Sequence, residues 1–222
     1  MRKLRTLLSW SSGKDSAWTL HALRSDPRYE VMALATTINE AADRVAMHAV
    51  RTDLLRAQSR AARLPLWELA IPSPCSNEQY ESVFRTAIAR AEEEGVDCFA
   101  FGDLFLADIR AYREKQLAAT KLTPLFPLWG RDTHQLAHEM IAGGLRARIT
   151  CVDPRVLPAS FAGREFDRAF LHDLPAGVDP CGERGEFHTF AYSGPMFSAP
   201  LSIANGVVLE RDGFVFADLV PI

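Results

Sequence analysis

Paired cysteines, a long apolar run and an excess of basic charge are all missing from this sequence of 222 residues. Its four cysteines lie far apart and form no Cys-x-x-Cys motif, so they indicate reduced thiols. No segment approaches the roughly 18 apolar residues of a membrane helix. The apolar stretch near the N-terminus ends at Trp10, too early for a secretory signal. We therefore expect a cytoplasmic protein without a membrane span.

The charge balance argues against nucleic-acid binding driven by phosphate neutralisation, although it does not exclude a local basic pocket. The net charge is −3 and the isoelectric point is about 6.1, whereas nucleic-acid binding through phosphate neutralisation favours a basic domain. With 48% apolar residues, a chain of this size can bury a core without disulfides or a structural metal. We expect a globular protein with no nucleic-acid partner. The oligomeric state stays open, with a homodimer as one option.

Short apolar runs alternate with amphipathic, helix-like stretches through most of the chain. This alternation predicts βαβ units, and hence an α/β fold with a parallel five-stranded sheet flanked by helices. Glycine and proline become frequent after Pro154, and residues 207–210 and 214–217 resemble a hairpin. We expect a first domain over 1–152 and a small C-terminal α+β subdomain over 153–222. The five runs span residues 4–10, 29–36, 66–71, 96–101 and 146–152.

The turn after the first run has the composition of a phosphate-binding loop. In sheets of this kind, ligands bind beyond the carboxyl ends of the strands, where a helix N-terminus attracts anions. Lys14 supplies a cation, Ser16 a hydroxyl and Asp15 a carboxylate suited to Mg²⁺. A Ser or Asp cap on an ordinary helix is the alternative interpretation. The turn reads Ser11-Ser12-Gly13-Lys14-Asp15-Ser16.

Two common nucleotide motifs do not fit this turn. Leu8 stands where a Walker A loop needs its first glycine, and Asp15 where it needs Ser or Thr. A dinucleotide Gly-x-Gly-x-x-Gly motif is also absent. The turn instead resembles the Ser-Gly-Gly-x-Asp-Ser pyrophosphate loop of N-type ATP pyrophosphatases, with Ser12 in place of the first glycine. Serine adopts positive φ less readily than glycine.

Two further groups of polar residues follow the fourth apolar run. Gly102 and Asp103 come directly after it, at the expected edge of the phosphate-binding turn, where Asp103 suits Mg²⁺ or a ribose. Arg113 is suited to clamp a phosphate or carboxylate. The alternatives are a strand-end turn at Asp103 and a solvated helix face in which Glu114 pairs with Arg110.

Residues 179–190 concentrate two carboxylates, a histidine, a threonine and a cysteine among glycines. Glu183 or Glu186 is placed to act on an amine nucleophile or a cationic substrate, and His188 to carry a proton. A polar turn that opens a hairpin is the alternative. His134 and His138 are spaced like zinc ligands, but their helix offers no third ligand beyond Glu139.

Taken together, these motifs resemble the diphthine–ammonia ligase family of pyrophosphate-loop ATP enzymes, and its bacterial branch in particular. The resemblance covers most of the chain, from Leu7 to about Phe216. It implies an adenine nucleotide alpha hydrolase-like (HUP-type) Rossmann-like domain with a smaller C-terminal part. The matching segments are 11–16, 45–48, 102–103 with 113–114, 127–129, and 181–190 with 194–195.

The resemblance implies an ATP-dependent amide ligase that uses Mg²⁺, free ammonia and a carboxylate on a small molecule or a protein. A carboxylate attacks the α-phosphate, and ammonia then displaces AMP. Lys14, Asp15, Glu183, Glu186 and His188 would be the catalytic residues, with Asp15 and Asp103 as magnesium ligands. Nucleotide binding would involve Ser11, Ser12, Gly13, Lys14, Asp15, Ser16, His48, Gly102, Asp103 and Arg113.

Two other functions remain compatible with the same scaffold. A non-catalytic adenine-nucleotide sensor would bind ATP without releasing AMP. A tRNA-thiolating enzyme would be expected to carry paired cysteines and a basic surface, and neither is present in this sequence. Diphthamide belongs to the elongation factor 2 of archaea and eukaryotes, so a bacterial-branch member implies a different acid.

Overall fold

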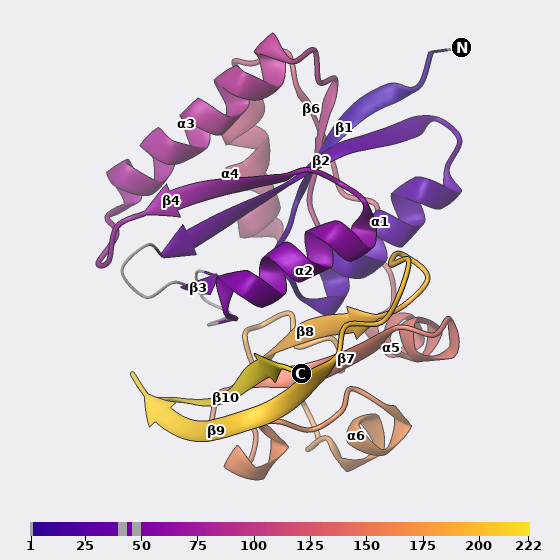
Figure 1. The fold of residues 1–222 in the computed structure, drawn as a ribbon, viewed down its shortest axis with the longest axis vertical. Coiled ribbons are helices and arrows are strands. Elements are labelled where there is room, and N and C mark those ends of the chain that lie inside the picture. The colour runs from indigo at the N-terminus through magenta and orange to yellow at the C-terminus, as the bar shows by residue number, and fades with distance from the viewer. Residues whose placement is uncertain (1, 40–43, 46–49) are drawn as a thin grey trace.

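The first part of the chain builds a parallel sheet in which each strand ends near the same edge (Figure 1). A computed structural model describes residues 2–39, 44–45 and 50–222. Five parallel strands run in the order β4-β2-β1-β5-β6, and the short β3 (Arg44–Val45) pairs antiparallel with the end of β2. The parallel strands are β1 (Leu4–Ser9), β2 (Tyr29–Asn39), β4 (Leu66–Ile71), β5 (Cys98–Ala100) and β6 (Thr123–Leu125).

Helices cover both faces of this sheet. Leu7 and Leu8 of β1 are fully buried on opposite faces, as expected for a strand between two helical layers. Helices α3 (Asn77–Glu93) and α4 (Ala107–Leu117) pack on one face. Helices α1 (Lys14–Ser25) and α2 (Thr52–Ala62) pack on the other, where they lie between the two sheets of the molecule (Figure 1).

Local sequence explains where α3 begins and ends. Ser76 and Gln79 form a reciprocal capping box, with the Ser76 side chain accepting from the Gln79 backbone N–H at 3.2 Å. Gly95 follows the helix with a φ of 67°, a left-handed conformation that suits glycine. The glycine stop that the sequence predicts after this helix is therefore confirmed.

The C-terminal part forms a separate antiparallel sheet in the order β8-β7-β10-β9. The predicted hairpin is confirmed, since β9 and β10 pair across Asp212 and Gly213, whose positive φ values suit a tight turn. Helix α5 (Thr133–Ala142) precedes this sheet, and the turn η1 (Ala159–Phe161) and α6 (Arg168–Asp173) are inserted within it. Its strands are β7 (Arg146–Val152), β8 (Phe187–Ser193), β9 (Ile203–Arg211) and β10 (Phe214–Pro221).

The α/β fold with five parallel strands is confirmed, but one strand was assigned to the wrong sheet. The apolar run at 146–152 is β7, which pairs with β8 and β10 rather than joining the parallel sheet. The fifth parallel strand is β6, a three-residue segment in which Pro124 lies opposite Phe99 of β5. An apolar run shows that a strand is buried but not which sheet it joins.

None of the described helices is long and apolar enough to cross a membrane.

Candidate functional site

The loop after β1 turns sharply before α1 begins. Ser12 has a φ of 69°, within the left-handed region that favours glycine. Helix α1 begins at Lys14, and its N-cap residue is Gly13, which has no side chain to cap the helix. The sequence-based alternative of an ordinary Ser- or Asp-capped helix is therefore wrong. The positive end of α1 instead faces the cavity that the loop encloses.

Lys14 is buried in this loop, with only 2% of its side chain exposed. Its Nζ donates to Asp15 Oδ2 at 2.8 Å and to the backbone carbonyl of Cys181. The ammonium also lies over the ring of Phe187, 5.3 Å from its centroid. Burial is the largest single effect and disfavours the charged amine, but the charge and hydrogen bond of Asp15 together with Cys181 and Glu183 outweigh it, so the pKa of Lys14 is raised. Lys14 is therefore a fixed cation.

Two buried carboxylate oxygens in the cavity have no hydrogen-bond partner among the described residues. They are Oδ1 of Asp15 and Oδ2 of Asp103. Burial raises the pKa of both side chains, and the charge of Asp15 raises the pKa of Asp103 further, against the opposing effect of Arg113. A cation bound nearby would stabilise the charged form of these buried carboxylates, and their oxygen atoms are ligands that suit Mg²⁺.

Gly102 allows the end of β5 to approach the start of α1. A Cβ atom at this position would lie 3.2 Å from two backbone atoms, the Asp15 carbonyl carbon and the Ser16 nitrogen. This close approach places Asp103 at the same edge of the sheet as the loop, where both line one cavity. Arg113 of α4 lines the cavity from the same direction, with its guanidinium 5.2 Å from the ring of Phe101.

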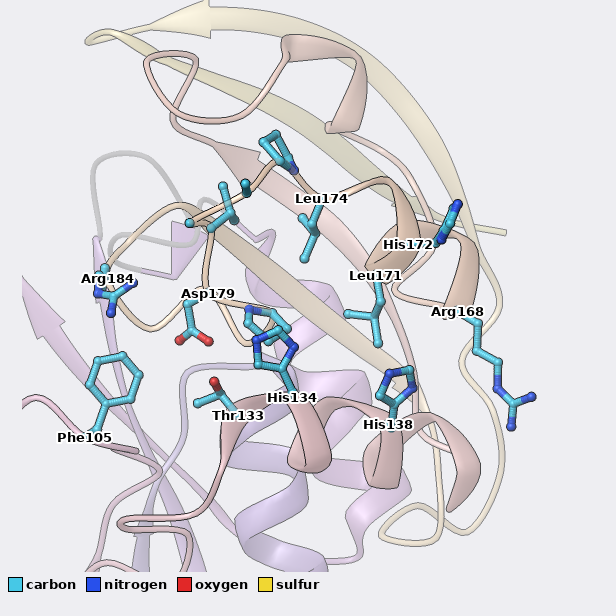
Figure 2. A pocket seen from close by; sticks show the side chains of 15 residues that line it. Phe105, Thr133, His134, His138, Arg168, Leu171, His172, Leu174, Asp179 and Arg184 are labelled. Carbon is cyan, nitrogen blue, oxygen red and sulfur yellow. The ribbon is translucent and has the colours of Figure 1, made fainter.

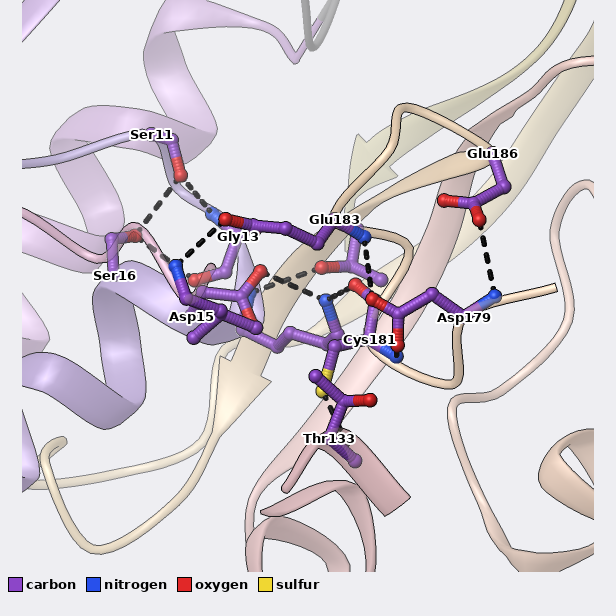
Figure 3. Close-up of polar contacts among 12 residues, drawn as sticks. Ser11, Gly13, Asp15, Ser16, Thr133, Asp179, Cys181, Glu183 and Glu186 are labelled. Carbon is purple, nitrogen blue, oxygen red and sulfur yellow. Dashed lines mark hydrogen bonds and ion pairs between the residues drawn. The ribbon is translucent and has the colours of Figure 1, made fainter. Parts of the chain in front are cut away.

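The turn before β8 closes the cavity from the other sheet (Figure 3). Glu183 is held in place because its Oε1 accepts the backbone N–H of Leu104 at 2.7 Å and of Phe105 at 3.4 Å. Burial raises the pKa of Glu183 to about 7, although these backbone hydrogen bonds oppose the shift. Glu183 is therefore poised to exchange a proton near neutral pH.

His188 and Thr189 of β8 line the same cavity. Burial lowers the pKa of His188 to about 4, with the charge of Lys14 adding to the effect. The imidazole is therefore neutral at pH 7 rather than a proton carrier in that range. Thr189 Oγ1 accepts the Lys14 backbone N–H at 3.0 Å. The first residue of α1 is thus bonded directly to the C-terminal sheet.

Glu186 lies behind this turn rather than in the cavity (Figure 3). Its Oε1 accepts the backbone N–H of Asp179 at 3.1 Å and its Oε2 that of Arg184 at 2.9 Å. Both oxygens are engaged and the side chain is buried. The structure therefore differs from the sequence-based expectation that Glu186 faces the reacting groups, because its carboxylate holds the shape of the turn.

Most of the predicted site residues line one cavity of about 270 Å³. A second cavity of about 380 Å³ adjoins it and shares Ser9, Ser11 and Arg113. Ser12 is fully buried within the loop and lines neither cavity. His48 lies outside the described residues. The predicted residues in the first cavity are Ser11, Gly13, Lys14, Asp15, Ser16, Gly102, Asp103, Arg113, Glu183 and His188.

Sequence reasoning missed Gln58 of α2, which supports the loop from below. Its Nε2 donates to the carbonyls of Ser12 at 2.9 Å and Ala191 at 2.6 Å, and its Oε1 accepts the Trp10 indole N–H at 2.9 Å. The side chain is fully buried. A lone glutamine in an amphipathic helix carries no motif, so nothing in the sequence distinguishes it.

The structure also bears on Cys181 and on the zinc-like spacing of His134 and His138. Burial strongly raises the pKa of Cys181, which makes its thiol a poor nucleophile. In the described part of the chain, no group of three or more His, Cys, Asp or Glu residues is arranged to hold a metal ion by protein ligands alone. His134 and His138 therefore do not form a zinc site there.

Comparison with known proteins identifies relatives for both sheets. The diphthamide synthase C-terminal domain family matches residues 132–214, from α5 to the start of β10. A diphthine–ammonia ligase of Danio rerio is 33% identical over 147 residues, which are 63% of this chain and 57% of the relative. The Homo sapiens enzyme of the same name is 29% identical over 149 residues, 64% of this chain and 55% of the relative.

A match over nearly the whole chain comes from the diphthine–ammonia ligase of Mus musculus, 24% identical over 229 residues. It covers 93% of this chain and 85% of the relative. The chain spans little more than half the length of the Danio rerio and Homo sapiens relatives. By these matches, the chain is similar to diphthine–ammonia ligases, and its residues 132–214 match the diphthamide synthase C-terminal domain family.

Proposed function

We propose that the protein is an ATP-dependent, AMP-forming amide ligase that joins ammonia to a carboxylate. The observation that carries this proposal is the Lys14–Asp15 ion pair at the start of α1, in which Lys14 is buried and which faces Glu183 across one cavity. A fixed cation, unpartnered carboxylate oxygens and a carboxyl group with a pKa of about 7 are the groups that adenylation and amidation need. Similarity to relatives named diphthine–ammonia ligase supports the same reaction class.

The phosphates of ATP would bind at the N-terminus of α1. A helix N-terminus attracts anions through its dipole and through N–H groups that have no partner within the helix, and at α1 the Lys14 N–H is one of these that Thr189 Oγ1 already accepts. The buried ammonium of Lys14 adds a full positive charge beside Asp15. Ser11 and Ser16 add hydroxyl groups to the same cavity, where their Oγ atoms lie 3.2 Å apart. The loop is therefore suited to the negative charge of a departing pyrophosphate.

The adjoining cavity is suited to the nucleoside. Its walls combine apolar side chains, among them Leu69, Ile71 and Phe99, with the polar Thr37 and Asn77. A site of mostly apolar surface with a few polar groups is typical for a base and ribose. Because this cavity shares Ser9, Ser11 and Arg113 with the phosphate cavity, one nucleotide can occupy both.

Magnesium fits the unpartnered oxygens of Asp15 and Asp103. Each is buried without a hydrogen-bond partner among the described residues, and each has a raised pKa. Bound there with the nucleotide, Mg²⁺ would neutralise phosphate charge. These two side chains would hold the ion, and Lys14 would keep Asp15 Oδ2 oriented by its 2.8 Å hydrogen bond.

The reaction would proceed in two steps. The carboxylate oxygen of the acid attacks the α-phosphorus, so that a C–O–P linkage forms and pyrophosphate leaves. Ammonia then attacks the acyl carbon, so that a C–N bond forms, AMP leaves and the nitrogen loses a proton. Glu183 is the residue that we assign to take this proton, because its pKa lies at about 7 and the Leu104 N–H fixes its carboxylate.

Isothermal titration with ATP tests the nucleotide site directly. We expect Mg²⁺-dependent binding that Asp15→Ala weakens by at least about tenfold, because the ion loses a ligand. Asp53→Ala is the matched control, since Asp53 is 79% exposed on α2 and lies outside both cavities. Binding that is unchanged in Asp15→Ala would overturn the site assignment.

A second assay tests the chemistry. Release of AMP and pyrophosphate should depend on both ammonia and a carboxylic acid. ATP binding without AMP release, across a broad screen of acids, would instead support the non-catalytic sensor.

A further inference from the structure

The proposed reaction has two anionic leaving groups, and the loop after β1 is suited to only one of them. Pyrophosphate leaves the α-phosphorus in the first step, beside the N-terminus of α1. AMP leaves the acyl carbon in the second step, and its phosphate gains a negative charge as the C–O bond breaks. A residue that stabilises this second charge has to contact the α-phosphate. The position of the α-phosphate therefore decides which residue serves this step.

The α-phosphate links the ribose of a nucleotide to the β-phosphate. With the nucleoside in the cavity of about 380 Å³ and the pyrophosphate part in the cavity of about 270 Å³, this link lies where the two cavities meet. Among the described residues, those that line both cavities are Ser9, Ser11 and Arg113. Arg113 alone of these carries a charge, so it is the cation at the junction.

The largest of the cavities considered is separate from this junction. It has a volume of about 670 Å³ and lies between α5 and α6 (Figure 2). In the described part of the chain, it shares no lining residue with either of the two smaller cavities. A nucleotide that spans the smaller cavities therefore makes no use of it.

The guanidinium of Arg113 retains hydrogen-bond donors for a ligand. Its Nη1 donates to the Tyr80 hydroxyl at 3.3 Å. Its Nε is buried without a hydrogen-bond partner, and its Nη2 forms no hydrogen bond with a described residue. The described carboxylates also form no ion pair with Arg113. Two of the three guanidinium nitrogens are therefore without a protein partner, a state that an anionic oxygen would relieve.

Aromatic side chains hold this guanidinium in position. Its central carbon lies 5.2 Å from the ring centroid of Phe101, 6.0 Å from that of Phe84 and 5.8 Å from that of Tyr112. Such rings stabilise a guanidinium without using its N–H groups. Tyr80, which accepts from Nη1, is itself stacked on Phe84, with the ring centroids 6.2 Å apart. The cation is thus oriented before a ligand binds.

Asp103 is an anion close to Arg113 that does not occupy it. The charge of Arg113 opposes the effect of burial on the pKa of Asp103, so the two groups interact through space. Asp103 Oδ2 nevertheless has no hydrogen-bond partner among the described residues. The guanidinium therefore stays available to a phosphate, and the carboxylate to a cation.

We propose that Arg113 binds the α-phosphate and is a catalytic residue in both steps, an inference that rests on the proposed ligase function. In the first step, the acid's carboxylate oxygen forms a bond to the α-phosphorus, and the bond from this phosphorus to the bridging oxygen of pyrophosphate breaks. In the second, ammonia forms the C–N bond, the C–O bond breaks and its electron pair stays on AMP. Arg113 donates to the non-bridging oxygens throughout and stabilises the charge that AMP gains.

Titrations with adenosine, AMP and inorganic pyrophosphate with Mg²⁺ test this assignment without turnover. We expect the wild type to bind AMP at least about tenfold more tightly than adenosine. Arg113→Gln should abolish this difference by weakening AMP binding alone, while the affinities for adenosine and pyrophosphate stay unchanged. Retained adenosine binding also shows that the variant is folded. An AMP preference that persists in Arg113→Gln, or that the wild type lacks, would overturn the proposal.

Two further variants refine the test. Arg110→Gln is the matched control on the same helix, because Arg110 pairs with Glu114 at 2.8 Å and lies outside both cavities. It should leave all three affinities unchanged. Arg113→Lys keeps the charge without the planar fork, and we expect it to lower the AMP preference by about threefold or more. An unchanged preference in Arg113→Lys would show that the fork does not contact the phosphate, contrary to the proposal.

The two sites can fail independently, which separates this inference from the proposed function. Asp15→Ala should weaken pyrophosphate binding and leave the AMP preference, the reverse of Arg113→Gln. If an acid and ammonia support AMP release, Arg113→Gln should lower kcat by about 10²-fold. An unchanged kcat would overturn the catalytic role. An AMP preference that depends on Arg113, without AMP release for any acid, would support the α-phosphate site and contradict the ligase function.

Discussion

Ser12 and Lys14 show how single residues of the loop depart from ordinary conformation and solvation. Ser12 is fully buried with a φ of 69°, and its hydroxyl has no hydrogen-bond partner among the described residues. A left-handed conformation costs a non-glycine residue about 1–2 kcal/mol. Its backbone carbonyl accepts from Gln58 and from the Ala191 N–H at 2.9 Å each. The backbone, not the hydroxyl, is therefore what the fold uses at this position.

Replacing Ser12 by glycine should be tolerated. Ser12→Gly removes the strain and the unpartnered hydroxyl, and we expect the free energy of unfolding to stay unchanged or to rise by up to about 1 kcal/mol. Urea unfolding measures this change, and ATP titration should give unchanged affinity. A large loss of ATP affinity would show that the hydroxyl has a role in binding.

The pKa of Glu183 predicts a pH dependence for the reaction. Because this pKa is about 7, the rate of AMP release should rise as the pH increases through 7 and then level off. Glu183→Gln should remove this rise and lower the rate by about 10²-fold or more. Initial rates of AMP release across the pH range, at saturating ATP and a constant concentration of unprotonated ammonia, measure the profile. A wild-type rise that persists in Glu183→Gln would assign the proton transfer to another group.

The raised pKa of Glu183 also makes the free energy of unfolding depend on pH. The folded pKa lies above the unfolded value of 4.5, so folding favours the protonated carboxyl. This contribution is fully present below pH 4.5 and is lost as the pH rises to about 7. Relative to wild type, Glu183→Gln should therefore gain stability over that interval.

At the scale of elements, α2 contributes to the site without entering either cavity of the proposed nucleotide site. Gln58 is the only described α2 side chain shown to bond both the loop after β1 and strand β8. Its third bond, to the Trp10 indole, joins it to the end of β1. The helix thus holds together two segments that lie 179 positions apart, at Ser12 and Ala191.

Removing this support should destabilise the protein and weaken ATP binding. Gln58→Ala leaves buried polar groups of Trp10 and Ala191 without their partner, and we expect a loss of about 2–4 kcal/mol in the free energy of unfolding. Gln135→Ala is the control, since Gln135 is exposed on α5 and should change stability by less than about 0.5 kcal/mol. Urea unfolding distinguishes the two, and equal stabilities would contradict this role of Gln58.

The sequence predicted most of the polar groups that line the site, but not the partners that hold them. The loop at 11–16 was found because its turn and helix start lie within six residues. Strand β6 was missed because three residues containing Pro124 carry no periodic pattern. Glu186 was expected beside the reaction, yet its carboxylate binds backbone N–H groups within its own turn. Residue type identifies polar groups, but only the fold shows which are already satisfied.

At the scale of the whole molecule, one hydrophobic core joins the two sheets. Leu8 and Leu34 of the parallel sheet, Trp18 and Leu20 of α1, and Phe190 of the antiparallel sheet belong to a single cluster of buried residues. On the face of the parallel sheet that α1 and α2 cover, the two parts therefore share one core. Separating them would expose apolar surface on both parts.

Unfolding should accordingly be a single transition. We expect urea curves from tryptophan fluorescence and from far-ultraviolet circular dichroism to coincide, although Trp10 and Trp18 lie in the shared core and Trp67 lies on the other face. A Trp67→Phe variant checks that both faces report the same midpoint. Two separated midpoints would show that the sheets unfold independently.

The bond between the Lys14 N–H and Thr189 Oγ1 has a consequence for protein synthesis, because it spans 175 positions. The ribosome makes the loop well before Thr189, the residue that accepts its first helical N–H. Cys181, whose carbonyl accepts from the Lys14 ammonium, is also made after the loop. A nascent chain therefore carries an incomplete loop until this later segment is made, and its lysine becomes enclosed only when strand β8 has emerged.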